Sequence, residues 1–356
     1  MSDHQKMESD IESTLDALVS RTANIPFHEA AERIYKLGTD YINTRTQLFA
    51  GSSAGNDEDC VGIYGGPTTP GAPRFFMQLW GALVNRVQHP PLEAEVHEEH
   101  ITRLVDFVSS IQAKTHPEGE EWFIGGQKCR WDSLPLLGAE IRDAHNEQID
   151  TMDFNSSILL SQEAQTAVAG AVQLEPKHLT DESTESDIIR LAKSRHQWLS
   201  FQSFISRLWR DCGRNEYAMY AIWALRPALE DWPESPPACD TKYETLEESP
   251  AYLAFQVEAA SVWICNTASL MYECTEIYGP RGDPNWPTRN APGRGGRRWD
   301  GVDGYDREHK RWQLWKDVLG EVIQWCDRAA KDQMQGWKVR DAAVRALEAM
   351  KAAERQ

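Results

Sequence analysis

The sequence predicts an all-α protein with an aromatic-rich core. Apolar residues recur every three to four positions along nearly the whole chain, and the alternating pattern of strands is missing. Eleven of the 14 tryptophans follow residue 197, many of them at the same helical spacing. We therefore expect a compact, irregular multi-helix domain of about ten helices.

Four helices are expected before residue 114. Each carries apolar residues at helical spacing, and Pro26 and Gly51 are start and stop signals for the second. A segment rich in Gly, Pro, Ser and Thr follows that helix and predicts a loop. The expected helices cover 11–18, 26–50, 76–87 and 91–111, and the expected loop covers 50–72.

The middle of the chain is less regular. Residues 114–130 are expected to form a loop, and Ser133 is expected to cap a helix that continues to residue 144. Residues 148–184 have few apolar positions and predict a flexible insertion or linker. We expect this segment to connect an N-terminal helical half, 1–147, with a Trp-rich C-terminal half, 185–356, the two packing as one domain.

The second half has the stronger helical pattern. One apolar stripe runs from Trp198 to Cys212, and residues 216–230 are apolar on all sides, which is typical of a central buried helix. A long helix is expected between Ser249-Pro250 and Gly279-Pro280. After a loop at 279–304, two further helices are expected at 312–329 and 337–347.

The charge balance argues against nucleic-acid and membrane partners. The chain has 37 Lys and Arg against 55 Asp and Glu, a formal net charge of −18, which repels phosphate and anionic lipids. No run of 18 apolar residues is present, and the polar N-terminus does not resemble a secretory signal.

The cysteines indicate a reducing compartment. Their number, seven, is odd, and no Cys-x-x-Cys pair occurs, so we expect neither disulfides nor a zinc site. The sequence favours the cytoplasm, with the nucleus as the alternative. No phosphate-binding loop, nucleophile elbow or dinucleotide fingerprint is present, so no cofactor is expected and no reaction is specified.

Glu93, His97 and His100 form one candidate binding site. Their spacing places all three on the apolar face of the helix expected at 91–111. Such polar groups could form a proton relay or hold a metal ion, but the pattern is not that of a zinc protease, and no metal is assigned. The alternative is an ordinary polar first turn of a helix.

Arg226 and Glu230 form a second candidate. Arg226 is the only charged residue between Tyr217 and Leu229, so its side chain needs a carboxylate, and Glu230 lies four residues later. We expect a structural ion pair at a kink caused by Pro227. The alternative is an arginine that anchors a substrate.

The loop at 279–304 is the only basic stretch of this acidic chain. It contains five arginines, opposed by only three aspartates. It could be a lid that captures an anionic ligand, or a plain surface loop. The five arginines are Arg281, Arg289, Arg294, Arg297 and Arg298.

Three segments carry a family resemblance. They are Trp131 to Gly138 (WDSLPLLG), Tyr217 to Glu230 (YAMYAIWALRPALE) and Arg311 to Trp315 (RWQLW). In this order they resemble a family of uncharacterised helical proteins from filamentous fungi, domain of unknown function 3632, over roughly residues 70–335. The resemblance implies a helical fold and a link to secondary-metabolite genes, but it carries over no catalytic residue.

Two functions remain open. The first is a small-molecule protein of secondary-metabolite biosynthesis, which binds or converts a hydrophobic metabolite in an aromatic pocket. Tryptophans such as Trp312 would supply its walls, and His97, His100 and Arg226 its polar groups. The second is a non-catalytic helical interaction or regulatory protein. A cavity favours the first, and a packed core with an exposed apolar patch favours the second.

Overall fold

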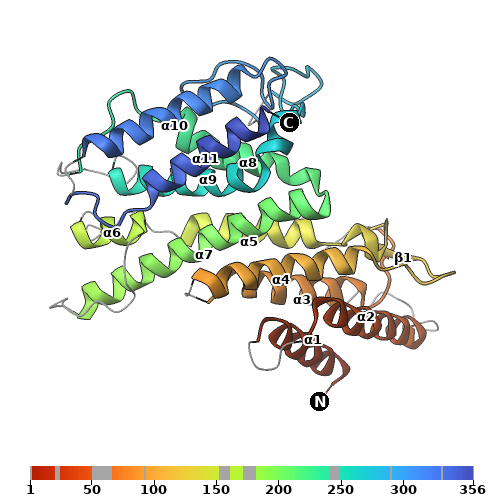
Figure 1. Ribbon diagram of the computed structural model, residues 1–356. Coiled ribbons are helices and arrows are strands. Elements are labelled where there is room, and N and C mark those ends of the chain that lie inside the picture. The colour runs from red at the N-terminus through yellow and green to blue at the C-terminus, as the bar shows by residue number, and fades with distance from the viewer. Residues whose placement is uncertain are drawn as a thin grey trace. The chain divides into compact units, whose positions relative to one another are not determined.

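The all-α fold is confirmed. The structure, a computed structural model, is 68% helical, with eleven α-helices and one two-stranded sheet among the described residues (Figure 1). The chain divides into two compact units, Met1–Ile149 and Asp150–Gln356. The described residues are 2–20, 25–49, 66–91, 94–151, 161–170, 182–239, 249–288, 291–329 and 332–355.

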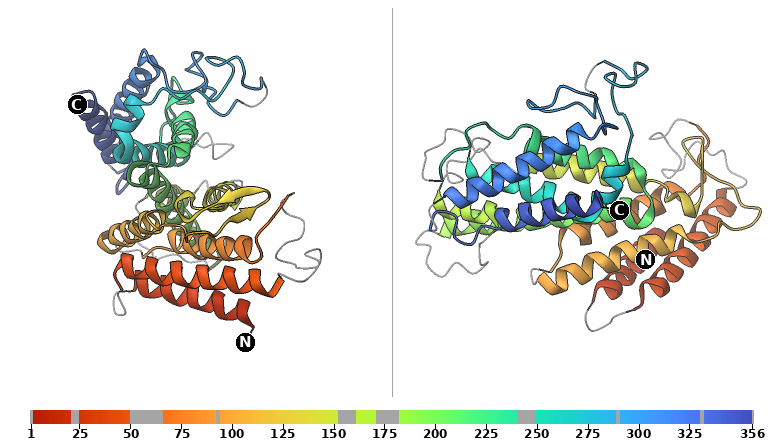
Figure 2. Two further views of the ribbon diagram at one scale, coloured as in Figure 1. Left: turned by 90° about the vertical axis from the view of Figure 1, so that its right-hand side faces the viewer. Right: turned by 45° about the horizontal axis from the view of Figure 1, so that its top comes forward.

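Unit 1 is a helical bundle with a short hairpin. Helix α2 packs against α1 and α4, and α3 packs against α1 (Figure 2). The elements are α1 (Asp3–Val19), α2 (Phe27–Phe49), α3 (Ala72–Gln88), α4 (Ala94–Gln112), β1 (Trp122–Ile124), β2 (Gln127–Cys129), the 3₁₀ turn η2 (Trp131–Ser133) and α5 (Leu137–Thr151).

Local hydrogen bonds correct three expectations in unit 1. Helix α1 begins well before Asp10, because Ser2 and Gln5 form a capping box. The expected loop at 114–130 contains the antiparallel hairpin β1–β2. Ser133 does not cap α5, because its hydroxyl accepts from Arg130 N and closes η2 instead.

The core of unit 1 is built around Trp131. Its fully buried ring lies 5.2 Å from Phe76, 5.8 Å from Phe75 and 6.0 Å from Trp122, measured between centroids. Gly38 of α2 faces these rings, and a Cβ there would lie 2.5 Å from Phe75. The glycine therefore lets α2 approach the aromatic cluster closely.

The segment 148–184, expected to be a flexible insertion or linker, contains an ordered helix. Helix α6 (Gln162–Ala169) is capped by the Ser161 hydroxyl and ends at Gly170. Its Ala167 and Val168 are buried. The neighbouring stretches 152–160 and 171–181 lie outside the described residues. The packing of both halves as one domain stays a prediction.

Unit 2 is organised around one central helix, α9. It contacts α6, α7, α8 and α11, and most of its residues are buried. Residues 216–230, expected to form one central buried helix, are mostly buried as well, and Trp223 is partly exposed. The remaining elements are α7 (Glu182–Cys212), the 3₁₀ turn η4 (Asn215–Tyr217), α8 (Ala218–Leu225), the π-helix η5 (Arg226–Glu230), α9 (Pro250–Glu273), α10 (Lys310–Arg328) and α11 (Val339–Ala353).

Most tryptophans of unit 2 are core residues, and some of their indoles are hydrogen-bonded, whereas Nε1 of Trp232 and of Trp337 is buried without a partner among the described residues. Trp263 Nε1 donates to Gln202 Oε1 on α7, and Trp325 Nε1 donates to Pro237 O. Such an acceptor offsets the cost of burying an indole N–H, so these two bonds help to fix the rings of Trp263 and Trp325. The aromatic core expected from the sequence is therefore present.

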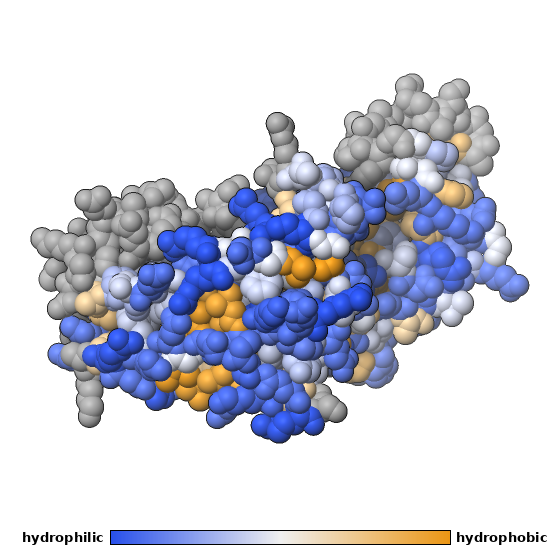
Figure 3. Space-filling view, turned by 90° about the horizontal axis from the view of Figure 1, so that it is seen from above, coloured by the Kyte–Doolittle hydropathy of each residue, from blue (hydrophilic) through white to orange (hydrophobic). Residues whose placement is uncertain are grey.

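Hydrophilic side chains cover most of the face shown in Figure 3, and apolar residues form separate small patches on it. Within the described parts of the chain, no helix combines the length and apolar character needed to cross a bilayer.

Candidate functional site

The two histidines of α4 differ in how deeply they are buried. Glu93 lies outside the described residues, and His97 is half-buried. His100 is buried, and its Nε2 lies 2.9 Å from Arg86 O in the last turn of α3. Burial lowers the pKa of His100, so its neutral ring donates to this carbonyl and ties α4 to α3. No three metal-ligating side chains come together among the residues that the structure describes.

The expected ion pair between Arg226 and Glu230 is wrong, because Glu230 pairs with Arg311. Arg311 Nε lies 2.7 Å from Glu230 Oε1, and Nη2 lies 3.0 Å from Oε2. Trp315 Nε1 and Gly296 N also donate to the carboxylate, each over 2.8 Å. Four donors therefore satisfy Glu230.

A π-helix explains this choice of partner. Pro227 has no backbone N–H, and the helix widens after α8, so that Asp231 N bonds to Arg226 O. The expected kink at Pro227 takes this form. Arg226 donates to Pro292 O instead of to Glu230.

Trp312 is buried in unit 2 and holds the C-terminal helix. Its Nε1 donates to Glu354 Oε1 over 2.9 Å, and its ring lies 5.3 Å from Tyr272. The side chain thus links α10 to the end of α11. The aromatic pocket expected around Trp312 and Arg226 stays a prediction.

The basic loop between α9 and α10 is pinned by carboxylates. Arg281 pairs with Asp303, Arg297 with Asp231, and Arg298 with Glu321. Arg289 lies outside the described residues. These pairs argue against a freely moving lid over this part of the loop.

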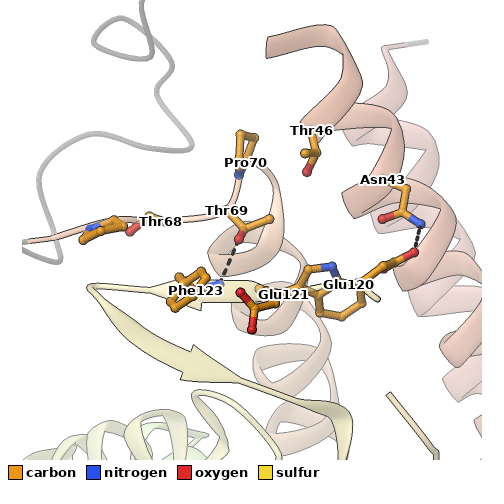
Figure 4. A pocket seen from close by; sticks show the side chains of 10 residues that line it. Asn43, Thr46, Thr68, Thr69, Pro70, Glu120, Glu121 and Phe123 are labelled. Atoms are coloured by element: carbon orange, nitrogen blue, oxygen red, sulfur yellow. Dashed lines mark hydrogen bonds between the residues drawn. The ribbon is translucent and has the colours of Figure 1, made fainter. Parts of the chain in front are cut away.

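A groove in unit 1 is the best candidate site. It encloses about 320 Å³ between the C-terminal turns of α2, the segment before α3 and strand β1 (Figure 4). Its lining residues are Asn43, Thr46, Pro67, Thr68, Thr69, Pro70, Glu120, Glu121, Trp122 and Phe123.

Hydrogen bonds that link Thr68 and Thr69 to the β1–β2 hairpin build one wall of the groove. Phe123 N donates to Thr69 Oγ1, and Thr69 N donates to Phe123 O, both over 2.8 Å. Thr68 Oγ1 accepts from Gly125 N at 3.0 Å. The segment before α3 is thereby fixed beside β1, so the wall is held in place without a ligand.

Glu120 has a carboxylate oxygen that can still accept a hydrogen bond. Its Oε1 accepts from Asn43 Nδ2 over 2.7 Å, whereas its Oε2 is buried and has no hydrogen-bond partner among the described residues. The neighbouring Glu121 is exposed and is bound by Lys128 at 2.5 Å. Glu120 Oε2 is therefore an acceptor that lacks a donor.

Among the described residues, no cationic side chain lines the groove. His116 lies behind it, with its ring 4.7 Å from Trp122, and only 7% of the residue is exposed. Burial lowers the pKa of His116, so the ring is neutral at pH 7. The lining charge is therefore negative.

Sequence reasoning missed this groove. Its residues come from three separate segments, and none has a motif spacing. The one available signal was the Glu120-Glu121-Trp122-Phe123 run, which places two carboxylates next to two aromatic rings inside an expected loop. The hairpin and its pairing with Thr69 were needed to bring Asn43 into reach.

Comparison with known protein families identifies the family of this chain. The family model described as "Protein of unknown function (DUF3632)" matches residues 80–319. The chain belongs to this family. No curated protein and no solved structure matches it. The DUF3632 region contains Glu120, Trp122, Glu230 and Arg311, whereas Asn43 precedes it.

Proposed function

We propose that this DUF3632 protein binds a small molecule in the groove of unit 1, and that the ligand presents an amine to Glu120. The buried, unpartnered Oε2 of Glu120 carries this proposal. An ionised carboxylate only accepts hydrogen bonds, and leaving one of its oxygens buried without a donor costs free energy. A ligand that donates to Oε2 offsets that cost.

A cationic donor fits better than a neutral one. The groove is lined by two carboxylates, Glu120 and Glu121, of which Glu121 is already paired with Lys128, and the chain has a net charge of −18. A protonated amine is attracted by this negative charge. Its charge-assisted hydrogen bond to Glu120 is also roughly twice as strong as a neutral one. An anionic ligand would be repelled.

The size and walls of the groove favour a metabolite. Its volume of about 320 Å³ lies at the small end of ligand pockets. Trp122, Phe123, Pro67 and Pro70 provide apolar surface for the body of the ligand. We include a role in fungal secondary-metabolite biosynthesis in the proposal, because the family resemblance suggests it.

One observation favours the alternative, a helical interaction protein. Leu48 near the end of α2 is 62% exposed, a large apolar side chain left in water. The small, separate apolar patches in Figure 3 give that face no broad docking surface. We therefore place ligand binding first.

Calorimetric titration with benzylamine tests the proposal, with benzyl alcohol as the neutral probe. We expect saturable binding of the amine and weaker binding of the alcohol. Glu120→Gln keeps the shape of the side chain and should weaken amine binding by tenfold or more, the value of a charge-assisted bond. Glu118→Gln is the matched control, because Glu118 is exposed and lies outside the groove lining.

Three results would count against the proposal. One is equal affinity for the amine and the alcohol. Another is equal weakening by both glutamine variants, which would indicate only a general charge effect. The third is no saturable heat with either probe.

A further inference from the structure

The π-helix of unit 2 leaves one arginine short of partners. A guanidinium has five N–H donors, and Arg226 has one assigned acceptor, Pro292 O. The same carbonyl accepts from Trp223 Nε1 at 2.9 Å, so it is already shared. Arg226 Nε is buried without a partner among the described residues.

The carboxylates nearest to Arg226 are already engaged. Glu230 is satisfied by Arg311, Trp315 and Gly296. Asp231 Oδ1 accepts from the backbone N–H of Arg297 at 2.8 Å and also pairs with its side chain. The positive charge of Arg226 therefore lacks a carboxylate of its own.

Arg294 brings a second positive charge to the same place. It follows Pro292 by two residues, and two residues span at most about 7 Å. Its side chain is exposed and makes no ion pair within the described ranges. Burial lowers the pKa of Arg226 most, the charges of Arg311 and Arg294 lower it further, and the carboxylates of Glu230 and Asp231 oppose this shift. Arg294 therefore adds positive charge beside Arg226, while the two carboxylates that act on Arg226 are engaged by other donors.

We infer that Arg226 and Arg294 form a binding site for an oxyanion, a carboxylate or a phosphate group. Guanidinium groups match both geometrically, and an anion would relieve their repulsion while using the free donors of Arg226. The partly exposed Trp223, whose indole N–H shares the Pro292 carbonyl with Arg226, offers an apolar side chain beside the charge. A small anion with a planar body fits this arrangement. The site at Arg226 and Arg294 is separate from the groove of unit 1, whose lining is negatively charged.

The test is calorimetric titration of the full chain at low ionic strength with benzoate and with phenyl phosphate. We expect saturable binding of at least one, and the stronger of the two identifies the oxyanion. Arg294→Gln should weaken binding at least tenfold, the loss expected for one charged contact. This variant changes an exposed side chain, so the fold is retained.

Two controls separate the site from other effects. Arg307→Gln removes an exposed arginine from the same stretch of chain and should change the affinity less than twofold. Glu120→Gln should leave anion binding unchanged, which keeps this result distinct from the groove. Absence of saturable binding, or equal weakening by the Arg294 and Arg307 variants, would overturn the inference.

Discussion

Arg311 and Glu230 form an ion pair that solvent does not reach, with side-chain exposures of 1% and 0%. The pair joins the first turn of α10 to the π-helix after α8. Arg311 Nη1 also donates to Gly293 O at 3.0 Å and to Gly304 O at 2.7 Å. The Arg311 guanidinium therefore connects α10, the π-helix and two separate points of the loop between α9 and α10.

Breaking this pair should strongly destabilise the protein. Arg311→Met or Glu230→Gln should each lower the free energy of unfolding by about 3–5 kcal/mol, because each leaves the other group buried without its partner. The double variant should cost less than the sum. Urea denaturation measures all three.

Arg340→Gln is the matched control for that experiment. Its pair with Asp327 is about half exposed on both sides, so the loss should stay below about 1 kcal/mol. Additive losses at Arg311 and Glu230 would show that the two side chains are not coupled. A loss of the same size at Arg340 would show that burial does not set the strength of the pair.

Two helical glycines should respond in opposite directions to alanine. Gly38→Ala places a Cβ 2.5 Å from the Phe75 ring and should cost about 1–3 kcal/mol through overpacking. Gly320→Ala on α10 meets no atom within 4 Å and should stabilise by about 0.5–1 kcal/mol. Thermal unfolding of both variants checks this, and a shift of the same sign in both would contradict it.

His145 should make the protein sensitive to acid. Burial lowers its pKa to about 4, below the value of about 6.5 expected in the unfolded chain. Between these values the unfolded chain binds the extra proton, so the stabilisation is complete above pH 6.5 and is lost as the pH falls toward 4.

The stability difference between wild type and His145→Gln should therefore shrink by up to about 3 kcal/mol over that range. Chemical denaturation at several pH values measures it. The exposed His28→Gln variant serves as a control for the loss of a surface histidine. A flat difference for His145 would mean that its ring is not neutral in the folded state.

Local signals predicted most of the helices, whereas side-chain partners depended on distant residues. The helical period and Pro26 located α2 within a few residues. For Glu230, the sequence offered only Arg226 four positions earlier. Its partner Arg311 lies 81 positions away, and the π-helix that selects it forms in the tertiary context.

The groove was beyond sequence reasoning for the same reason. Asn43 and Glu120 are 77 positions apart, and their contact depends on a hairpin too short to produce an alternating pattern. In contrast, His100 was correctly placed on the inner face of its helix. Its acceptor, the carbonyl of Arg86, could not be identified because any backbone oxygen can serve.

A crystal structure with bound benzylamine tests the central claim most directly, through the position of the amine nitrogen. The account predicts that this nitrogen lies about 3 Å from Glu120 Oε2, with the ring against the apolar wall of the groove. An amine bound elsewhere, or a groove without amine at saturating concentration, would contradict the assignment of this groove as the ligand site.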